Sequence, residues 1–286
     1  MNNILELVDV SKQYPDFTLD NVSFSLPYGS ITGFIGENGA GKTTTLNLIL
    51  NLISLDGGSI KLFGKDSKTL DKLSKEDIGV IFDENSFHEN LTPMEISNFM
   101  SKIYQKWDQP LFLQYMDKYN LPIKKRLKEL SKGMKVKFSI AAALSHHPKL
   151  LILDEAISAL DPIMRNEILD SFLDFVQDEE HSILFSTHIT TDLQKVADYI
   201  VFIDKGKIIF HKSKDELIYN YGIIRCKSEQ FPQIDREDII AYHKSEHQIE
   251  VLTDDREKAV KKYGNLLIDN ATIEEIMMLY IKGMKI

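Results

Sequence analysis

The sequence predicts an α/β fold: a parallel sheet covered on both faces, an inserted helical subdomain, and a small C-terminal α/β domain. Four short segments, at residues 31–35, 78–82, 150–153 and 183–185, are continuously apolar. Such runs are typical of parallel strands buried on both faces. Residues from about 85 to 148 look mainly helical, and from about residue 212 the glycine density falls. These observations place a main domain at 1–212, its helical subdomain at about 85–148, and an accessory domain at 213–286.

Size and composition are those of an ordinary globular protein. The 286 residues, 43% of them apolar, suffice for one large and one small domain. The net charge of −9 argues against a nucleic-acid-binding surface, so we expect no nucleic-acid partner. The single cysteine, Cys226, excludes an internal disulfide and a thiolate metal site, and we expect it to be buried or half-buried.

The chain shows no sign of membrane insertion. Its longest apolar runs, such as residues 150–153 and 200–203, are too short to cross a bilayer, and the N-terminus lacks the pattern of a signal peptide. We therefore expect the protein to stay in the cytoplasm.

The first predicted strand leads into the sequence GENGAGKTT, and residues 44–52 after it look helical. The spacing G-x-x-x-x-G-K-[ST] between a strand and a helix predicts a phosphate-binding loop, because glycines let successive backbone N–H groups point at phosphate oxygens. Lys42 would reach the β- and γ-phosphates, and Thr43 would ligate Mg²⁺. The candidate binding residues are Gly36, Asn38, Gly39, Ala40, Gly41, Lys42, Thr43 and Thr44.

Polar residues follow the other predicted strands: Asp83 and Glu84, Asp154 and Glu155, Thr187 and His188. Because the carboxyl ends of parallel strands meet at one edge of a sheet, we expect these side chains to surround the phosphate loop. Asp154 would hold Mg²⁺ through its water shell. Glu155 would act as the general base toward the attacking water.

Two helix starts are marked inside the predicted helical subdomain. Thr92, Pro93 and Glu95 have the spacing of an N-cap, a first-turn proline and a capping-box glutamate. Ser131 and Gly133 open a second helix, expected to run to about residue 146. The start of that helix could present N–H groups and a helix dipole to an anion.

The C-terminal residues predict short strands near 222–227 and 248–252 and a final helix. Thr272 and Glu275 have capping-box spacing. Apolar residues on one face of this helix predict packing on its own domain or a contact with a partner. They are Ile273, Ile276, Met277, Tyr280 and Ile281.

The order and spacing of these motifs resemble the ATP-binding-cassette (ABC) family over about residues 1–212. The phosphate loop is followed by LSKGM at residues 130–134, LLILDE at 150–155, SALD at 158–161 and STH at 186–188. These resemble the Walker A loop, signature, Walker B strand, D-loop and switch histidine of an ABC ATPase, a P-loop NTPase. The resemblance implies an ATPase that uses ATP and Mg²⁺ and powers a separate transmembrane permease, at the inner face of the cell membrane.

The resemblance also implies roles for individual residues. Ser131 and Gly133 would bind the γ-phosphate of ATP held by an opposite subunit, and Asp161 would complete the D-loop across that interface. One chain carries one loop and one signature, so complete sites need a second nucleotide-binding subunit, most simply a homodimer. His188 would contact the γ-phosphate and orient water, and Tyr14 would stack on adenine.

The sequence departs from the family pattern at three positions. Asp83 stands where the family usually has glutamine, where it could still hold Mg²⁺ but adds negative charge near the triphosphate. Lys132 replaces a glycine within the signature, and Ala156 replaces a proline after Glu155. The LSKGM form resembles a branch of bacterial exporters, including those for antimicrobial or amphipathic peptides.

Two other functions fit an ABC ATPase. A soluble member acting on ribosomes or DNA usually carries two cassettes or a long coiled-coil insertion, and neither sign is found in this sequence. A nucleotide-sensing regulator without turnover would fit if Asp83 weakens catalysis. Measured ATP hydrolysis separates these readings.

Overall fold

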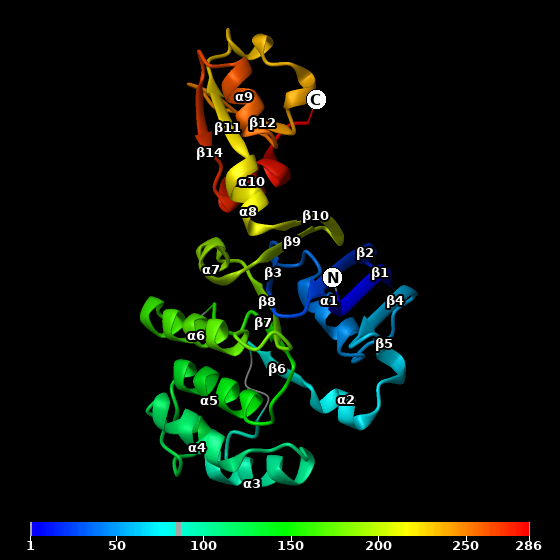
Figure 1. Cartoon of the computed structure of the whole chain (residues 1–286), viewed down its shortest axis with the longest axis vertical. Coiled ribbons are helices and arrows are strands. Elements are labelled where there is room, and N and C mark those ends of the chain that lie inside the picture. Colours follow the sequence, from blue (N-terminus) through cyan, green and yellow to red (C-terminus); the bar gives the residue numbers. More distant parts are fainter. Residues whose placement is uncertain (1, 84–86, 159, 286) are drawn as a thin grey trace.

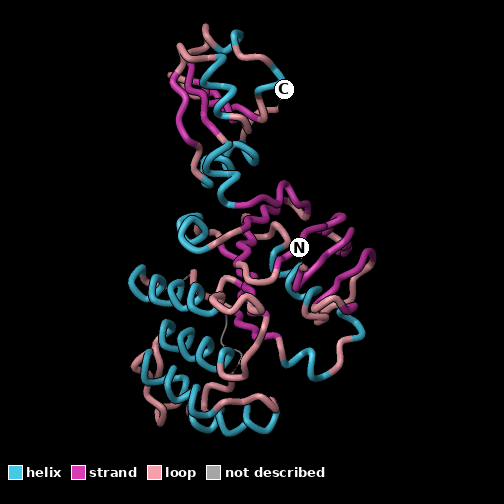
Figure 2. The backbone as a smooth tube through the Cα atoms, viewed as in Figure 1, coloured by secondary structure: helices cyan, strands magenta, loops and turns pink. Residues whose placement is uncertain are grey.

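The computed structural model describes residues 2–83, 87–158 and 160–285. A six-stranded sheet runs through the main body, and a separate group of strands lies near the C-terminus (Figure 2). None of the helices in the described residues combines the length and apolar character that a bilayer-spanning segment needs.

The central sheet confirms the four predicted strands. Its strands are β3 (Ile31–Ile35), β6 (Ile78–Phe82), β7 (Leu150–Asp154), β8 (Ser182–Thr187), β9 (Tyr199–Asp204) and β10 (Lys207–Ser213). They follow the order β10-β9-β3-β8-β7-β6, and all pairs are parallel except the antiparallel pair of β9 and β10. Every residue of β3, β7 and β8 is buried, as continuous apolar runs predict.

Successive residues of the sheet fill two different cores. Leu151 and Leu153 of β7 belong to one buried cluster, whereas Leu150 and Ile152 belong to the other. This follows from the alternation of side chains across a strand. The sheet therefore has helices on one face and a second sheet with one helix on the other.

The second sheet is antiparallel and was not predicted. It contains β1 (Asn3–Tyr14), β2 (Phe17–Pro27), β4 (Gly57–Leu62) and β5 (Lys65–Asp66), in the order β2-β1-β4-β5. Along β2, Val22, Phe24 and Leu26 are buried while the residues between them are at least partly exposed. One-sided burial gives alternating patterns, and a search for continuous apolar runs misses them.

Ten helices are described: α1 (Lys42–Ile49), α2 (Lys72–Glu76), α3 (Pro93–Ile103), α4 (Gln109–Lys118), α5 (Lys132–Leu144), α6 (Pro162–Phe175), α7 (Thr190–Val196), α8 (Lys214–Asn220), α9 (Arg256–Lys262) and α10 (Ile273–Lys282). Short 3-10 turns lie at Ser67–Thr69, Leu127–Glu129, Phe231–Gln233 and Arg236–Asp238. Helices α3 to α6 lie in a row beside the sheet, at the end of the molecule away from the C-terminus (Figure 1).

The starts of α3, α5 and α10 are as predicted, but both predicted ends of α1 and the predicted end of α5 were wrong. Thr92 and Glu95 form the predicted capping box at α3. Helix α1 occupies 42–49 instead of 44–52, and Asn51 just beyond its end has a left-handed φ of 55°. Helix α5 ends at Leu144 instead of about 146, because His147 is also left-handed (φ 53°) and Pro148 follows. Left-handed residues and proline end helices at such positions.

The C-terminal residues form an antiparallel sheet of their own. Its strands are β11 (Gly222–Cys226), β12 (Ala241–Lys244), β13 (Ile249–Thr253) and β14 (Leu267–Asn270), in the order β12-β13-β11-β14. The two predicted strands are confirmed to within a residue, whereas β12 and β14 were missed. Cys226 is buried, as expected.

Helix α10 joins this sheet to the main body. Its residues Ile273, Ile276 and Leu279 are buried in the same cluster as Leu193 and Val196 of α7. The other residues of the predicted apolar face, Met277, Tyr280 and Ile281, are partly buried against that cluster. The apolar face of α10 thus packs within the chain, partly on β12 and partly on α7.

Candidate functional site

The polar residues after the central strands meet at one edge of the sheet, as predicted. Parallel register places Ile35 beside Thr187 and Asp154 beside Ser186, so β3, β7 and β8 end together. The glycine loop, Glu155 and His188 follow these strand ends directly. Glu84, which was also expected here, lies outside the described residues.

The loop after β3 wraps around the side chain of Lys42. Its Nζ atom donates to the carbonyl oxygens of Gly36 (2.7 Å) and Glu37 (3.2 Å), and only 5% of the residue is exposed. Gly41, the N-cap of α1, has a φ of 115°, a conformation that favours glycine. A Cβ at Gly36 would lie 2.4 Å from the carbonyl oxygen of Ile203, so the loop cannot accept a side chain there without moving.

A cavity of about 480 Å³ opens over this loop. Its size falls within the range of small-molecule sites in proteins. The described residues that line it are Asp16, Phe17, Asn38, Gly39, Gly41, Lys42, Thr43, Thr44 and Glu155. Ala40 is instead buried in the core below the loop.

The aromatic side chain in this wall is that of Phe17. Tyr14 pairs with Phe17 across the turn between β1 and β2, is 39% exposed, and is not one of the described lining residues. The Cζ atom of Phe17 is 3.0 Å from where a Cβ of Gly41 would lie. The sequence did not single out Phe17, because no short motif shows that the turn between β1 and β2 places Phe17 in the cavity lining.

Glu155 is held by groups on three sides. Its Oε2 accepts from the Ser158 hydroxyl (2.8 Å) and lies 2.7 Å from Nδ1 of His188, while its Oε1 lies 3.2 Å from Nζ of Lys42. Burial alone would raise the pKa of Glu155, but the hydrogen bonds from Ser158 and His188 and the charge of Lys42 outweigh it and hold the pKa below its usual value. The carboxylate is therefore ionised at neutral pH.

The backbone of Glu155 has a left-handed φ of 53°. Such a φ is uncommon for a residue other than glycine, asparagine or aspartate, and strained residues cluster at functional sites. The N–H of Glu155 donates to the hydroxyl of Ser186 (3.0 Å), which in turn donates to Oδ1 of Asp154 (2.7 Å). Ser186 thus fixes both acidic residues. Sequence reasoning gave no role to Ser186 or Ser158, because serine is common at strand ends and turns.

The signature residues lie on another part of the molecule. Ser131 caps α5 and Asp161 caps α6, each accepting backbone N–H groups of its own helix. Gly133 lies against the Met164 side chain of α6, since a Cβ there would lie 2.9 Å from Sδ of Met164. None of Ser131, Gly133 and Asp161 is among the described residues that line the 480 Å³ cavity.

Asp83, at the end of β6, forms an ion pair with Lys132. The distance from Oδ1 to Nζ is 3.2 Å, and both side chains are about half exposed. The position that departs from the family pattern after β6 thus contacts the position that departs from it in the signature.

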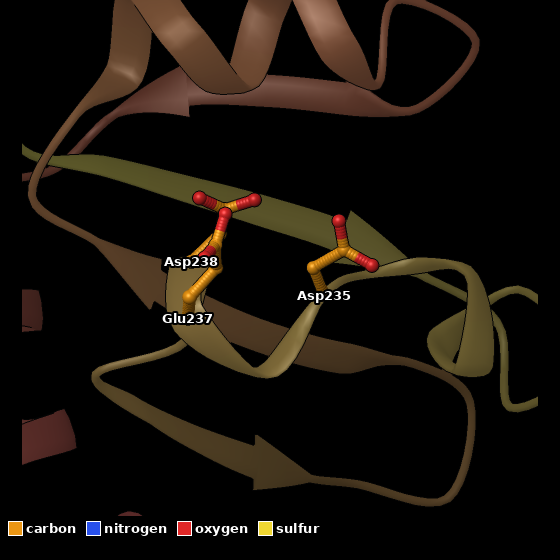
Figure 3. A group of neighbouring side chains, drawn as sticks. All are labelled: Asp235, Glu237 and Asp238. Carbon is orange, nitrogen blue, oxygen red and sulfur yellow. The ribbon is translucent and has the colours of Figure 1, made fainter.

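Two other features fit an anionic ligand less well. A cavity of about 520 Å³ between β11 and α10 has three glutamates, Glu250, Glu274 and Glu275, and one lysine, Lys282, in its lining, so its charged side chains are mainly acidic. The carboxylates of Asp235, Glu237 and Asp238 lie within 4.8 Å of one another (Figure 3).

Two lysine ammonium groups already form ion pairs with that trio. Nζ of Lys262 lies 2.5 Å from Asp235 and 2.7 Å from Asp238, and Nζ of Lys258 lies 2.6 Å from Asp238. We therefore interpret the trio as a structural ion-pair network.

Comparison with known proteins agrees with this geometry. The model of the ABC transporter family matches residues 19–158. The ABC transporter ATP-binding protein YtrB of Bacillus subtilis is 31% identical over 76% of this chain and 75% of its own length. The bacitracin transport ATP-binding protein BcrA of Enterococcus faecalis is 33% identical over 76% of this chain and 71% of its own.

A solved ATP-binding subunit of an ABC transporter gives a TM-score of 0.67 at 25% identity, over 75% of this chain and 91% of its own. These matches cover about three quarters of the sequence. The chain therefore belongs to the ABC transporter family, in which it is an ATP-hydrolysing, nucleotide-binding subunit.

Proposed function

We propose that the cavity over the glycine loop binds the triphosphate of ATP and that Glu155 activates the attacking water. The observation that carries the proposal is the position of Glu155, which lines the cavity and lies between Lys42 and His188. An ionised carboxylate in this place can accept a proton from water while an ammonium group stabilises phosphate charge.

The loop supplies the phosphate-binding groups. Gly36 to Thr44 offer backbone N–H groups and the start of α1, and the Lys42 ammonium adds a buried positive charge. His188 would orient the water and contact the γ-phosphate. Adenine would stack on the aromatic hairpin of Tyr14 and Phe17, of which Phe17 lines the cavity.

The donor set beside the loop fits Mg²⁺. Thr43, which carries a hydroxyl, lines the cavity, and Ser186 orients the Asp154 carboxylate at the same strand edge. Hydroxyl and carboxylate oxygens are the ligands that Mg²⁺ prefers. When bound, the ion would neutralise charge on the β- and γ-phosphates.

Two copies of the chain would make two complete sites. Ser131, Gly133 and Asp161 lie at the adjacent starts of α5 and α6, and Ile163 beside them is 82% exposed. An exposed apolar residue next to two helix N-termini suits an interface that closes over the phosphates of a second subunit. We propose a homodimer on this basis.

We further propose that the dimer works at the inner face of the cell membrane on a separate permease. One relative is named for bacitracin transport, and the LSKGM signature resembles that of peptide exporters. The cargo is accordingly proposed to be an amphipathic peptide that is moved outward.

Replacing Glu155 tests the mechanism. Glu155→Gln keeps the shape but removes the base, and hydrolysis should fall about 10²- to 10⁴-fold while ATP binding persists. Glu246→Gln, at an exposed site in the turn between β12 and β13, is the matched control and should leave the rate unchanged. Unchanged hydrolysis in Glu155→Gln would reject the proposed role of Glu155.

A further inference from the structure

We propose that Asp83 and Lys132 act as one unit, which ties the end of β6 to the first turn of the signature helix. Asp83 is then a positioning residue and not a magnesium ligand. The inference rests on the proposed function, because it assigns the roles of two residues beside the same site.

The pair joins two segments that the function must coordinate. Asp83 follows Phe82, whose position in the sheet is beside Asp154. Lys132 follows Ser131, the N-cap of α5. The 3.2 Å ion pair therefore links the chain next to the acidic residues of one site with the signature, which would serve the opposite site.

The start of α5 needs negative charge from elsewhere. A helix N-terminus disfavours cations, yet α5 begins with Lys132, has Lys135 in its next turn, and has no acidic residue in its first turn. Each lysine finds a carboxylate on the chain after β6: Lys132 pairs with Asp83, and Lys135 lies 2.6 Å from Glu89. These carboxylates offset the unfavourable positive charge at the start of α5, which is the physical reason for the pairing.

The same pairing answers the charge problem that Asp83 creates. An aspartate in place of glutamine adds a negative charge directly after β6, and the Lys132 ammonium, 3.2 Å away, offsets it. The two departures from the family pattern are thus one compensated change. Replacing both residues should therefore lower activity by less than the two single replacements would together.

The effect should be small and sensitive to salt. The side chains of Lys132 and Asp83 are 58% and 50% exposed, so solvent and ions screen the pair. Measured couplings of exposed pairs correspond to about two- to fivefold in an equilibrium or rate ratio.

A double-mutant cycle on the full chain tests the inference. The variants are Asp83→Asn, Lys132→Gln and the double variant, with kcat/KM for ATP and the half-saturating Mg²⁺ concentration measured at low and high salt. We expect each single change to lower kcat/KM about two- to fivefold, and the double variant to be no worse than the poorer single one. High salt should remove this non-additivity, and the Mg²⁺ requirement should stay the same.

The pair Lys149–Glu180 is the matched control. Its ammonium and carboxylate lie 2.5 Å apart with 37% and 69% exposure, but at the opposite edge of the sheet, before β7 and β8. The cycle of Glu180→Gln and Lys149→Gln should leave kcat/KM unchanged. Urea midpoints of all variants establish that they fold.

Additive effects of Asp83→Asn and Lys132→Gln would overturn the inference. So would an increase of about tenfold or more in the Mg²⁺ requirement of Asp83→Asn alone, as expected for a residue that holds the ion. If Glu155→Gln is inactive and the cycle is additive, this inference fails while the proposed function stands. If Glu155→Gln hydrolyses ATP normally, the proposed function fails, and this inference fails with it.

Discussion

The ion pair between Lys137 and Glu167 predicts an asymmetry in stability. Lys137 on α5 lies 2.7 Å from Glu167 on α6, and its ammonium lies 5.5 Å from the ring centroid of Tyr119. The side chain of Lys137 is 9% exposed, whereas that of Glu167 is 38% exposed. Removing one partner therefore costs more than removing the other.

Among the described residues, Glu167→Ala would leave the mostly buried Lys137 ammonium with the ring of Tyr119 as its remaining recorded partner. Breaking a fully buried pair costs about 3–5 kcal/mol, and partial access of water at this site lowers our expectation to about 2 kcal/mol. Lys137→Met keeps most of the buried length and leaves a carboxylate that reaches water. We expect a cost of about 1 kcal/mol or less, mainly the lost cation–π contact.

Urea unfolding of the full chain, followed by circular dichroism, measures both changes. The midpoint should fall more in Glu167→Ala than in Lys137→Met, and the double variant should resemble Lys137→Met. Because α5 and α6 begin at Ser131 and Asp161, ATP hydrolysis should fall with stability. A larger loss in Lys137→Met than in Glu167→Ala would refute the reasoning from burial.

Three further predictions follow from local geometry. Gly41→Ala should lower ATP affinity about tenfold or more, because the added Cβ would lie 3.0 Å from both Phe17 and Leu19 at a φ of 115°; Gly64→Ala, at a φ of 74° with nothing within 4 Å, shares the backbone strain and should bind a fluorescent ATP analogue normally. Thr272→Ala breaks the capping box of α10 and should cost about 1 kcal/mol in urea unfolding, and Thr272→Ser should recover most of it. Burial alone would raise the pKa of Asp238, but hydrogen bonds from Lys258, Lys262 and Tyr263 outweigh it and hold the pKa far below the usual 3.8. Since a depressed carboxyl pKa contributes stability above the unfolded pKa, that contribution should be lost as the pH falls below about 4, and Asp238→Asn should be destabilised at neutral pH but lose less on acidification.

The parallel strands were predictable because burial on both faces makes them continuously apolar. The second sheet, that of β1, β2, β4 and β5, was not predicted because polar residues alternate with its buried ones, as at Ser23 and Ser25 in β2. Strands β12 and β14 are four residues each and carry too little pattern to separate them from loops.

The chemistry of the site was predictable where a motif fixes it, as in the glycine loop and the pair Asp154 and Glu155. Contacts between distant segments were not. Ser186 lies 32 residues from Asp154, and Lys132 lies far along the chain from Asp83, so only the folded sheet and helices bring these side chains together. That Phe17, and not Tyr14, is among the described residues lining the cavity likewise depends on the geometry of the turn between β1 and β2, which no short motif predicts.

The short helix α7 makes the C-terminal residues a structural support for the site. It starts two residues after His188, and it rests on the sheet on one side and against α10 on the other. A chain cut after β10 would remove the contact of α10 with α7, the helix that begins two residues after His188. We therefore expect such a truncated protein to bind ATP normally through the glycine loop but to hydrolyse it slowly. An assay of ATP binding alone would not detect the defect.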